Sequence, residues 1–165
     1  YYEYIQNQDF PDSLNWVAQH RNAIVLRTFS KIYGLAGLPV GFGLTTPDIA
    51  GYLNRIRPPF NVNSVAQRAA LAALTDDEHV ARSRALNAAE MATVRAGLVA
   101  LGFQPVPSQA NFLLFDVGRD GRAVFEALLR QGVIVRHIEG HLLRVTIGLP
   151  EENRYFLDAL KKVLS

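Results

Sequence analysis

The pattern of apolar and polar positions changes near the middle of the chain. In the second half, short apolar runs alternate with stretches in which apolar side chains recur every three or four residues, spacings typical of strands and helices respectively. The runs predict strands at residues 111–117, 133–136 and 141–147, and the periodic stretches predict helices at 121–131 and 151–164. This order of strand, helix, strand, strand and helix is typical of a small sheet with two helices packed on one face.

The first half contains shorter and less regular apolar runs. Strands are expected at residues 23–27 and 40–45, on either side of a glycine-rich turn, and helices at 48–56 and 63–74. We expect the first of these strands to be buried and Trp16 to lie in the core, because large apolar side chains are mostly found inside.

A long helix is predicted between the two halves. It opens with the acidic run Asp76–Glu78, which suits the positive end of a helix dipole, and Gly102 is a natural C-terminal cap. Four apolar residues recur along it at steps of three and four and form one buried stripe: Met91, Val94, Leu98 and Leu101. We therefore divide this α/β chain into two parts. The first is residues 1–75, and the second is residues 76–165, which contain the linking helix and a small C-terminal domain.

Composition restricts the classes of function. The chain has no cysteine, which excludes disulfides and thiolate metal sites, and its net charge of +2 is spread over scattered Lys and Arg, so no nucleic-acid interface is indicated. His79, His137 and His141 lack metal-ligand spacing and are expected to be surface or packing residues, so no metal site is predicted. No apolar run approaches the roughly 18 residues of a membrane span. We expect a cytoplasmic protein and, because the chain begins at Tyr1 without an initiator Met, a piece of a longer one.

Lys31 is the leading candidate for a catalytic residue. A lysine directly after a strand is usually a solvated surface charge. Here, however, Thr28 and Ser30 offer hydroxyl groups, and Gly34 and Gly37 permit close backbone approach, which together make a plausible phosphate cradle, although not a P-loop. An amine beside such a cradle is what a phosphate-bearing aldehyde cofactor needs to be captured as a Schiff base. The sequence therefore favours pyridoxal phosphate chemistry.

Three segments resemble, in the same order, the motifs of one enzyme family. Arg27–Lys31, followed by Leu35–Leu38 and Gly41–Gly43, is similar to the cofactor-lysine segment of fold-type I pyridoxal-phosphate aminotransferases, most closely the histidinol-phosphate aminotransferases. Tyr1–Tyr4 resembles the end of that family's D-E-A-Y-x-E-[FY] motif, and Leu143–Gly148 resembles its L-R-[IV]-[ST]-[IV]-G. The resemblance covers nearly the whole chain and implies the end of the mostly parallel large-domain sheet of fold type I, followed by a small α/β C-terminal domain.

The resemblance also implies cofactor-binding roles. Lys31 would hold pyridoxal 5'-phosphate and then move a proton between the substrate carbon and the cofactor. Thr28 and Ser30 would bind the cofactor phosphate, and Tyr1 would bind its phenolic oxygen.

Two arginines are the candidate substrate-binding residues. Strand alternation places Arg144 on the face opposite Leu143, Val145 and Ile147. Judged apart from the family resemblance, an arginine between apolar neighbours, such as Arg144, is more often part of a partly buried ion pair. An arginine at a strand end, such as Arg136, is commonly solvated. The resemblance implies that Arg144 grips the substrate's carboxylate or an equivalent anion through a two-pronged guanidinium contact, and that Arg136 lies near the substrate phosphate.

The implied protein is a homodimeric aminotransferase of histidine biosynthesis. It would move an amino group from a small-molecule amino donor, histidinol phosphate, to a 2-oxo acid, 2-oxoglutarate.

The chain departs from the family in two ways. Pro39 replaces an arginine that binds the cofactor phosphate, which removes a charge-assisted bond unless Arg27, Arg55 or Arg57 reaches in. The aspartate that pairs with the pyridine nitrogen would precede Tyr1, so we expect this piece alone to be inactive or nearly so.

Other interpretations stay open. A threonine-phosphate decarboxylase resembles the chain in the same motifs and is distinguished by release of carbon dioxide instead of formation of a keto acid. An aromatic or other amino-acid aminotransferase is also possible, because residues that recognise the substrate side chain are absent. A non-enzymatic interpretation is that the chain is a non-catalytic α/β interaction module. In that case the Ser-Lys-Gly run is a turn without a catalytic role. Borohydride reduction with pyridoxal phosphate, followed by mapping of the labelled peptide, would discriminate it.

Overall fold

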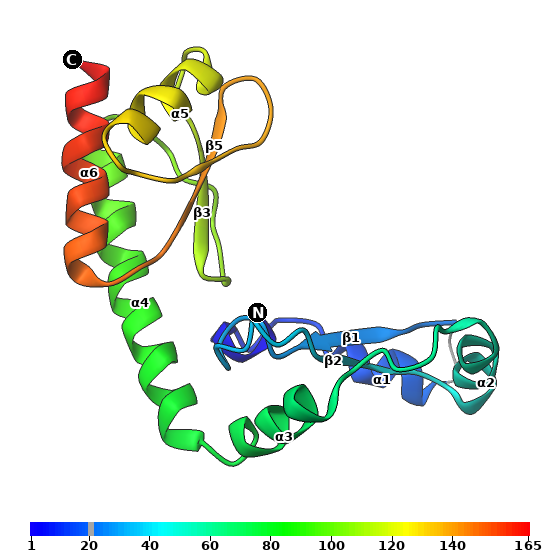
Figure 1. Cartoon of the computed structure of the whole chain (residues 1–165). Helices are drawn as coiled ribbons and strands as arrows, with labels where there is room; N and C mark the ends of the chain where they lie inside the picture. Colours follow the sequence, from blue (N-terminus) through cyan, green and yellow to red (C-terminus); the bar gives the residue numbers. More distant parts are fainter. Residues whose placement is uncertain (20–21) are drawn as a thin grey trace. The chain divides into compact units, whose positions relative to one another are not determined.

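A computed structural model describes residues 1–19 and 22–165 of the chain. The described residues divide into two compact units, Tyr1–Ala81 and Arg82–Ser165 (Figure 1). Helix α4 (Asp77–Ala100) begins in the first unit and continues through the second. The predicted long helix is therefore confirmed, and each unit is described by itself below.

The second unit is built on a three-stranded antiparallel sheet in the order β3-β5-β4. Its strands and helices are β3 (Phe112–Asp116), α5 (Gly121–Arg130), β4 (Arg136–His137), β5 (Leu142–Thr146) and α6 (Pro150–Leu164). This confirms the predicted order of elements (Figure 1). Only the strand expected at residues 133–136 differs, because the ladder at this edge of the sheet contains just two residues.

One face of this sheet forms the core. Alternation along β3 and β5 points Leu113, Phe115, Leu143 and Val145 to the same side, where they are buried. The helices add further buried side chains, including Val94, Leu98, Val124, Leu128, Phe156 and Leu160. Two of them, Val94 and Leu98, belong to the stripe predicted on α4, and the other two members of the stripe pack partly buried against the same cluster. The unit thus closes its own apolar core.

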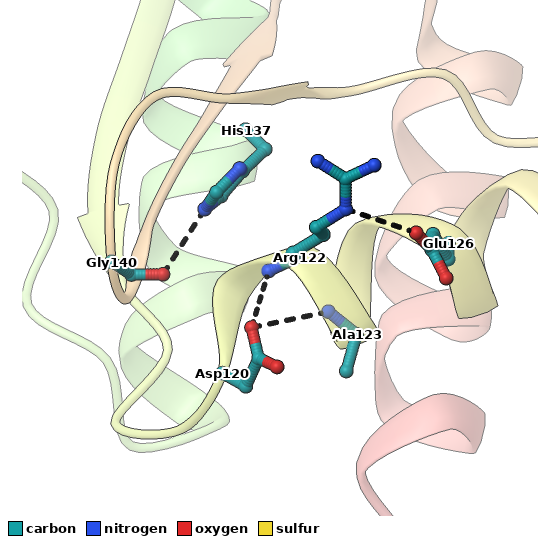
Figure 2. Close-up of polar contacts among 6 residues, drawn as sticks. All are labelled: Asp120, Arg122, Ala123, Glu126, His137 and Gly140. Carbon is teal, nitrogen blue, oxygen red and sulfur yellow. Dashed lines mark hydrogen bonds and ion pairs between the residues drawn. The ribbon is translucent and has the colours of Figure 1, made fainter.

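Helix ends in the second unit follow local signals in the sequence. Asp120 caps α5, because its Oδ1 accepts hydrogen bonds from the backbone nitrogens of Arg122 at 2.9 Å and Ala123 at 3.4 Å (Figure 2). Gly102 adopts a φ of +91°, in the left-handed region that glycine tolerates best, and ends α4 as predicted.

The first unit contains one antiparallel pair of short strands, β1 (Val25–Thr28) and β2 (Gly41–Leu44), among its described residues. The parallel pairing expected for a mostly parallel sheet is therefore not found here. The helical elements of this unit are the 3-10 turn η1 (Tyr2–Tyr4), α1 (Ser13–Ala18), α2 (Pro47–Ile56), α3 (Ser64–Ala73) and the start of α4.

Two burial predictions for the first unit are wrong. The strand β1 is buried on one side only, since Val25 is buried whereas Leu26 is 73% exposed. Trp16 is 45% exposed instead of lying in the core. Both errors have the same physical cause, because a two-stranded ribbon with short flanking helices has too few elements to cover both of its faces.

Candidate functional site

The lysine loop, residues 29–40, connects β1 to β2. Phe29 anchors its start, because its N–H donates and its carbonyl accepts backbone hydrogen bonds of 3.1 and 3.0 Å within the loop. The side chains of Phe29 and Ile32 are buried, whereas Lys31 between them is exposed. The loop is therefore fixed by its apolar residues and presents the Lys31 amine at the surface of the unit.

The two hydroxyl side chains proposed for the phosphate lie together at the start of this loop. The Thr28 hydroxyl donates to Ser30 Oγ at 3.0 Å, and the Ser30 N–H donates to Thr28 Oγ1 at 3.1 Å. Among the described residues, the hydroxyl pair uses one of its two hydroxyl hydrogens, so the second can donate to a phosphate oxygen. Both groups thus fit a phosphate-bearing cofactor held next to Lys31.

The tyrosines of the N-terminal turn contact the basic side chains of the same region. Lys31 Nζ lies 5.4 Å from the ring centroid of Tyr1, and Arg27 Cζ lies 4.2 Å from that of Tyr2, both within cation–π range. Burial is the main cause of a raised pKa of the Tyr4 hydroxyl. Tyr1, which the sequence assigned to the cofactor, therefore lies beside the candidate catalytic amine.

A groove of about 910 Å³ opens next to these residues in the first unit. Tyr1, Arg27 and Thr28 line it together with apolar side chains, among them Trp16 and Phe42. A mainly apolar groove with a few polar groups is the usual form of a site for a small organic molecule. The exposure of Trp16 is explained by its place in this lining.

Pro39 stands where the family resemblance implies a phosphate-binding arginine, and Arg27, Arg55 and Arg57 are the candidate replacements. Arg55 lies over an aromatic ring of its own helix, with its Cζ 5.4 Å from the centroid, and Arg57 Nε donates to an asparagine of the same helix at 3.0 Å. Arg27 instead lines the groove next to Thr28. Of the three, Arg27 is the one that lines the groove together with Thr28, and one of its terminal nitrogens donates to the Leu26 carbonyl at 3.2 Å.

The two candidate substrate arginines are direct neighbours in the second unit. The strand register pairs Arg136 of β4 with Arg144 of β5. Directly opposed residues in antiparallel strands point to the same face of the sheet, and here that face is opposite the one on which Leu143 and Val145 enter the core. Like charges in this position are unfavourable unless an anion lies between them. This arginine pair can therefore bind a carboxylate or phosphate.

Arg144 has an unsatisfied donor. Its guanidinium carbon lies 4.8 Å from the ring centroid of Phe112, and its Nε is buried without a hydrogen-bond partner among the described residues. A buried unpaired donor costs about 1–3 kcal/mol. A bound anion would remove this cost, so the orphaned N–H fits an anion-binding role.

Arg136 is exposed and lines a hollow of about 300 Å³ with Arg122 and His137. Figure 2 shows that the other two side chains already have partners. Arg122 Nε donates to Glu126 Oε1 at 3.2 Å, and His137 Nε2 donates to the carbonyl of Gly140 at 3.1 Å. Arg136 is thus the better placed of these side chains to contact a ligand.

One contact near Lys31 was missed by the sequence. His79 was expected to be a surface or packing residue, but its Nε2 lies 2.9 Å from the carbonyl oxygen of Ile32 in the lysine loop. No local pattern signals this hydrogen bond, because the two residues are far apart in the chain and meet only in the folded unit.

Two further properties concern residues 1–19 and 22–165 alone. Within these ranges no helix combines the length and the apolar character needed to cross a membrane. In the same ranges, no three His, Cys, Asp or Glu side chains are grouped so that they could hold a metal ion.

Comparison with known proteins identifies the family. The sequence model of "Aminotransferase class I and II" matches residues 1–160. The chain is 52% identical over 169 residues to histidinol-phosphate aminotransferase 2 of Pseudomonas fluorescens, covering 100% of the chain and 46% of that protein. It is 51% identical over 168 residues to histidinol-phosphate aminotransferase 1 of Nitrosococcus oceani, covering 99% of the chain and 45% of that protein. The chain thus spans about half the length of these curated relatives.

The fold is found in a solved structure as well. Histidinol-phosphate aminotransferase from Sinorhizobium meliloti, crystallised in complex with pyridoxal-5'-phosphate, matches with a TM-score of 0.88 and 28% identity, over 98% of this chain and 46% of that one. This confirms the fold class expected from the sequence, the end of a fold-type I large domain followed by a small α/β domain. The sequence, the fold and the order of the motifs agree, and the chain belongs to the class I and II aminotransferases.

Proposed function

We propose that this chain is part of a pyridoxal-phosphate-dependent aminotransferase that transfers the amino group of histidinol phosphate to 2-oxoglutarate in histidine biosynthesis. The observation that carries the proposal is the arrangement around Lys31, where an exposed amine lies beside Tyr1 and directly after the hydroxyl pair of Thr28 and Ser30. The similarity to relatives named histidinol-phosphate aminotransferase supports the choice of substrates.

The residues of the first unit would bind and orient the cofactor. Pyridoxal phosphate, when bound, supplies an electron-withdrawing ring that stabilises negative charge at the substrate carbon. Thr28 and Ser30 would bind its phosphate, with the Ser30 hydroxyl as the free donor, and Arg27 would supply the positive charge that Pro39 does not. The Tyr1 hydroxyl would donate to the phenolic oxygen. Lys31 Nζ would hold the aldehyde carbon and, once released by the incoming amine, would carry the proton.

The arginine pair of the second unit would bind the anionic end of the substrate. Arg144 offers a fixed guanidinium with an unpaired buried Nε, and Arg136 adds a second positive charge on the same face of the sheet. A dianionic phosphate ester satisfies two adjacent guanidinium groups better than a neutral side chain does. Histidinol phosphate and the carboxylates of 2-oxoglutarate both carry such anionic ends.

We further propose that the full-length protein is a cytoplasmic homodimer. The first unit exposes a series of large apolar side chains on α2, on the segment that follows it and on α3, namely Tyr52, Ile56, Phe60, Val65 and Leu71. Phe60 is 97% exposed and adopts a φ of +59°, a strained conformation for a residue other than glycine. Exposed apolar patches often mark protein interfaces. Light scattering of the full-length protein would test the dimer, and a monomeric mass would contradict it.

The enzymatic proposal is tested on the full-length protein. We expect histidinol phosphate and 2-oxoglutarate to yield glutamate and the keto product, and borohydride reduction with pyridoxal phosphate to label the peptide that contains Lys31. Carbon dioxide release from threonine phosphate would indicate the decarboxylase instead, and a faster reaction with aromatic donors would indicate another aminotransferase. A label elsewhere, or none, would favour the interaction module. The 165-residue chain alone is expected to show no efficient transamination, and robust turnover would contradict that expectation.

A further inference from the structure

We infer that His79 is a positioning residue for Lys31, acting through the carbonyl group of Ile32. His79 lies in the first turn of α4, and its Nε2 is 2.9 Å from the Ile32 oxygen. Because a carbonyl oxygen only accepts hydrogen bonds, this nitrogen must carry the hydrogen. The contact joins two segments separated by 47 positions in the sequence, both inside the first unit.

The donor side of this contact is held in place by the start of α4. Asp76 caps the helix, and its Oδ1 accepts a hydrogen bond from the backbone N–H of His79 itself at 2.9 Å. The cap thereby fixes the backbone from which the imidazole projects. The histidine is part of a regular helix and not of a flexible surface segment.

The acceptor side is equally constrained. The Ile32 side chain is 2% exposed and anchors the loop by burial, while its carbonyl oxygen accepts the hydrogen bond from His79. The preceding carbonyl, that of Lys31, accepts a hydrogen bond from the N–H of Gly34 at 2.9 Å. Gly34 has a φ of +71°, which glycine adopts readily. With both carbonyls bonded, the peptide planes that follow the Lys31 Cα are fixed, and with them the direction in which the side chain leaves the loop.

In this proposal His79 neither binds a ligand nor takes part in the chemistry. Its ring contacts the backbone carbonyl of Ile32, so its proposed effect on the Lys31 amine is transmitted through the backbone of the loop. It would restrict the backbone of the lysine loop, so that the amine is already oriented before a ligand arrives. Pre-organised groups lose less entropy when they react, which is how a contact outside the reacting atoms affects a rate.

Full-length protein carrying His79→Ala or His79→Gln tests the inference. Gln places its amide nitrogen at nearly the same distance from Cα as the histidine Nε2, so it can restore the donor, whereas Ala removes it. The first measurement is hydrogen exchange of the Gly34 and Leu35 amides in cofactor-free protein. We expect these amides to exchange about 5- to 10-fold faster in H79A, the factor set by one ordinary hydrogen bond, and at nearly wild-type rates in H79Q.

A matched control is His141→Ala in the second unit, because the His141 ring also bonds a backbone carbonyl, that of Arg119. We expect this change to leave exchange in the lysine loop unaltered. Unchanged exchange in H79A, or faster exchange in both H79A and H79Q, would overturn the inference. If H79A does not fold, H79N replaces it, because the shorter amide cannot reach the Ile32 carbonyl.

The second measurement rests on the proposed function. In H79A we expect kcat to fall about 10-fold with KM for the amino donor nearly unchanged, and H79Q to recover most of kcat, since only the orientation of the amine is altered. An equal rise of KM in both variants would mean a structural role and would contradict positioning. If wild-type protein shows no aminotransferase activity, the proposed function fails, whereas the exchange result still decides the role of His79.

Discussion

The two units of this chain differ in how completely they bury their apolar residues. The second unit covers one face of its sheet with three helices and has a continuous core from Val94 to Leu160. The first unit has a two-stranded ribbon, a groove of about 910 Å³ and several exposed aromatic residues. This difference indicates that most of the stabilising apolar burial of this chain lies in the second unit. The candidate reactive amine lies in the first unit, which buries fewer apolar side chains.

The largest effect is expected on chemistry in the first unit. Full-length protein with Lys31→Ala should lose at least about 10³-fold in transamination rate, because no other group replaces its amine as proton carrier. The variant should also lose the borohydride-dependent label on this peptide. Lys162→Ala in the second unit is a suitable control and should keep both. Retained labelling or turnover in K31A would show that the reactive amine lies elsewhere.

The contrast in burial is tested by the same substitution in each unit. Leu143→Ala removes a fully buried side chain from the second unit, and we expect the free energy of unfolding to fall by about 2–5 kcal/mol. Leu26→Ala changes an exposed residue of the first unit and should alter it by less than about 0.5 kcal/mol. Urea unfolding followed by circular dichroism measures both. Similar losses for the two variants would mean that the units are equally consolidated.

The arginine pair provides a test on the face of the sheet opposite the core of the second unit. Arg144→Lys keeps the charge but removes the two-pronged geometry and the Nε donor, so we expect KM for histidinol phosphate to rise about 10- to 100-fold. Arg130→Gln, at the exposed end of α5, serves as a control and should leave KM unchanged. An R144K variant with wild-type KM would exclude Arg144 as the substrate clamp.

The smallest effects are expected at helix caps, which exist in both units. Asp120→Ala and Asn63→Ala each remove a side chain that accepts a backbone hydrogen bond at the start of a helix, α5 and α3 respectively. Each should cost about 1 kcal/mol. We expect the loss in D120A to lower the urea midpoint of the chain, and the loss in N63A to appear chiefly as faster hydrogen exchange within α3, because that helix buries only Ala66 and Ala70. A lower midpoint in N63A but not in D120A would reverse the comparison.

Much of the local structure followed from the sequence alone. Alternation along β5 predicted that Arg144 lies on the face opposite Leu143 and Val145, and in the structure these two side chains are buried whereas Arg144 is not. The cap residue Gly102 and the acidic start of α4 were likewise predicted. These features depend on neighbours within a few positions, such as strand period, backbone conformation and helix dipole, so a single sequence contains enough information to predict them.

Other features were decided only by the tertiary structure. The sequence placed Lys31 after a strand beside two hydroxyls, and the family resemblance placed Tyr1 at the same cofactor, but neither indicated that the imidazole of His79 reaches the lysine loop. Nor did it determine that Leu26 and Trp16 remain exposed, because burial depends on which distant segments cover a surface. The pairing of Arg136 with Arg144 also required the strand register. Each of these features depends on which segments of the chain meet or cover one another in the fold, whereas hydrophobic periodicity describes only positions within a few residues of each other.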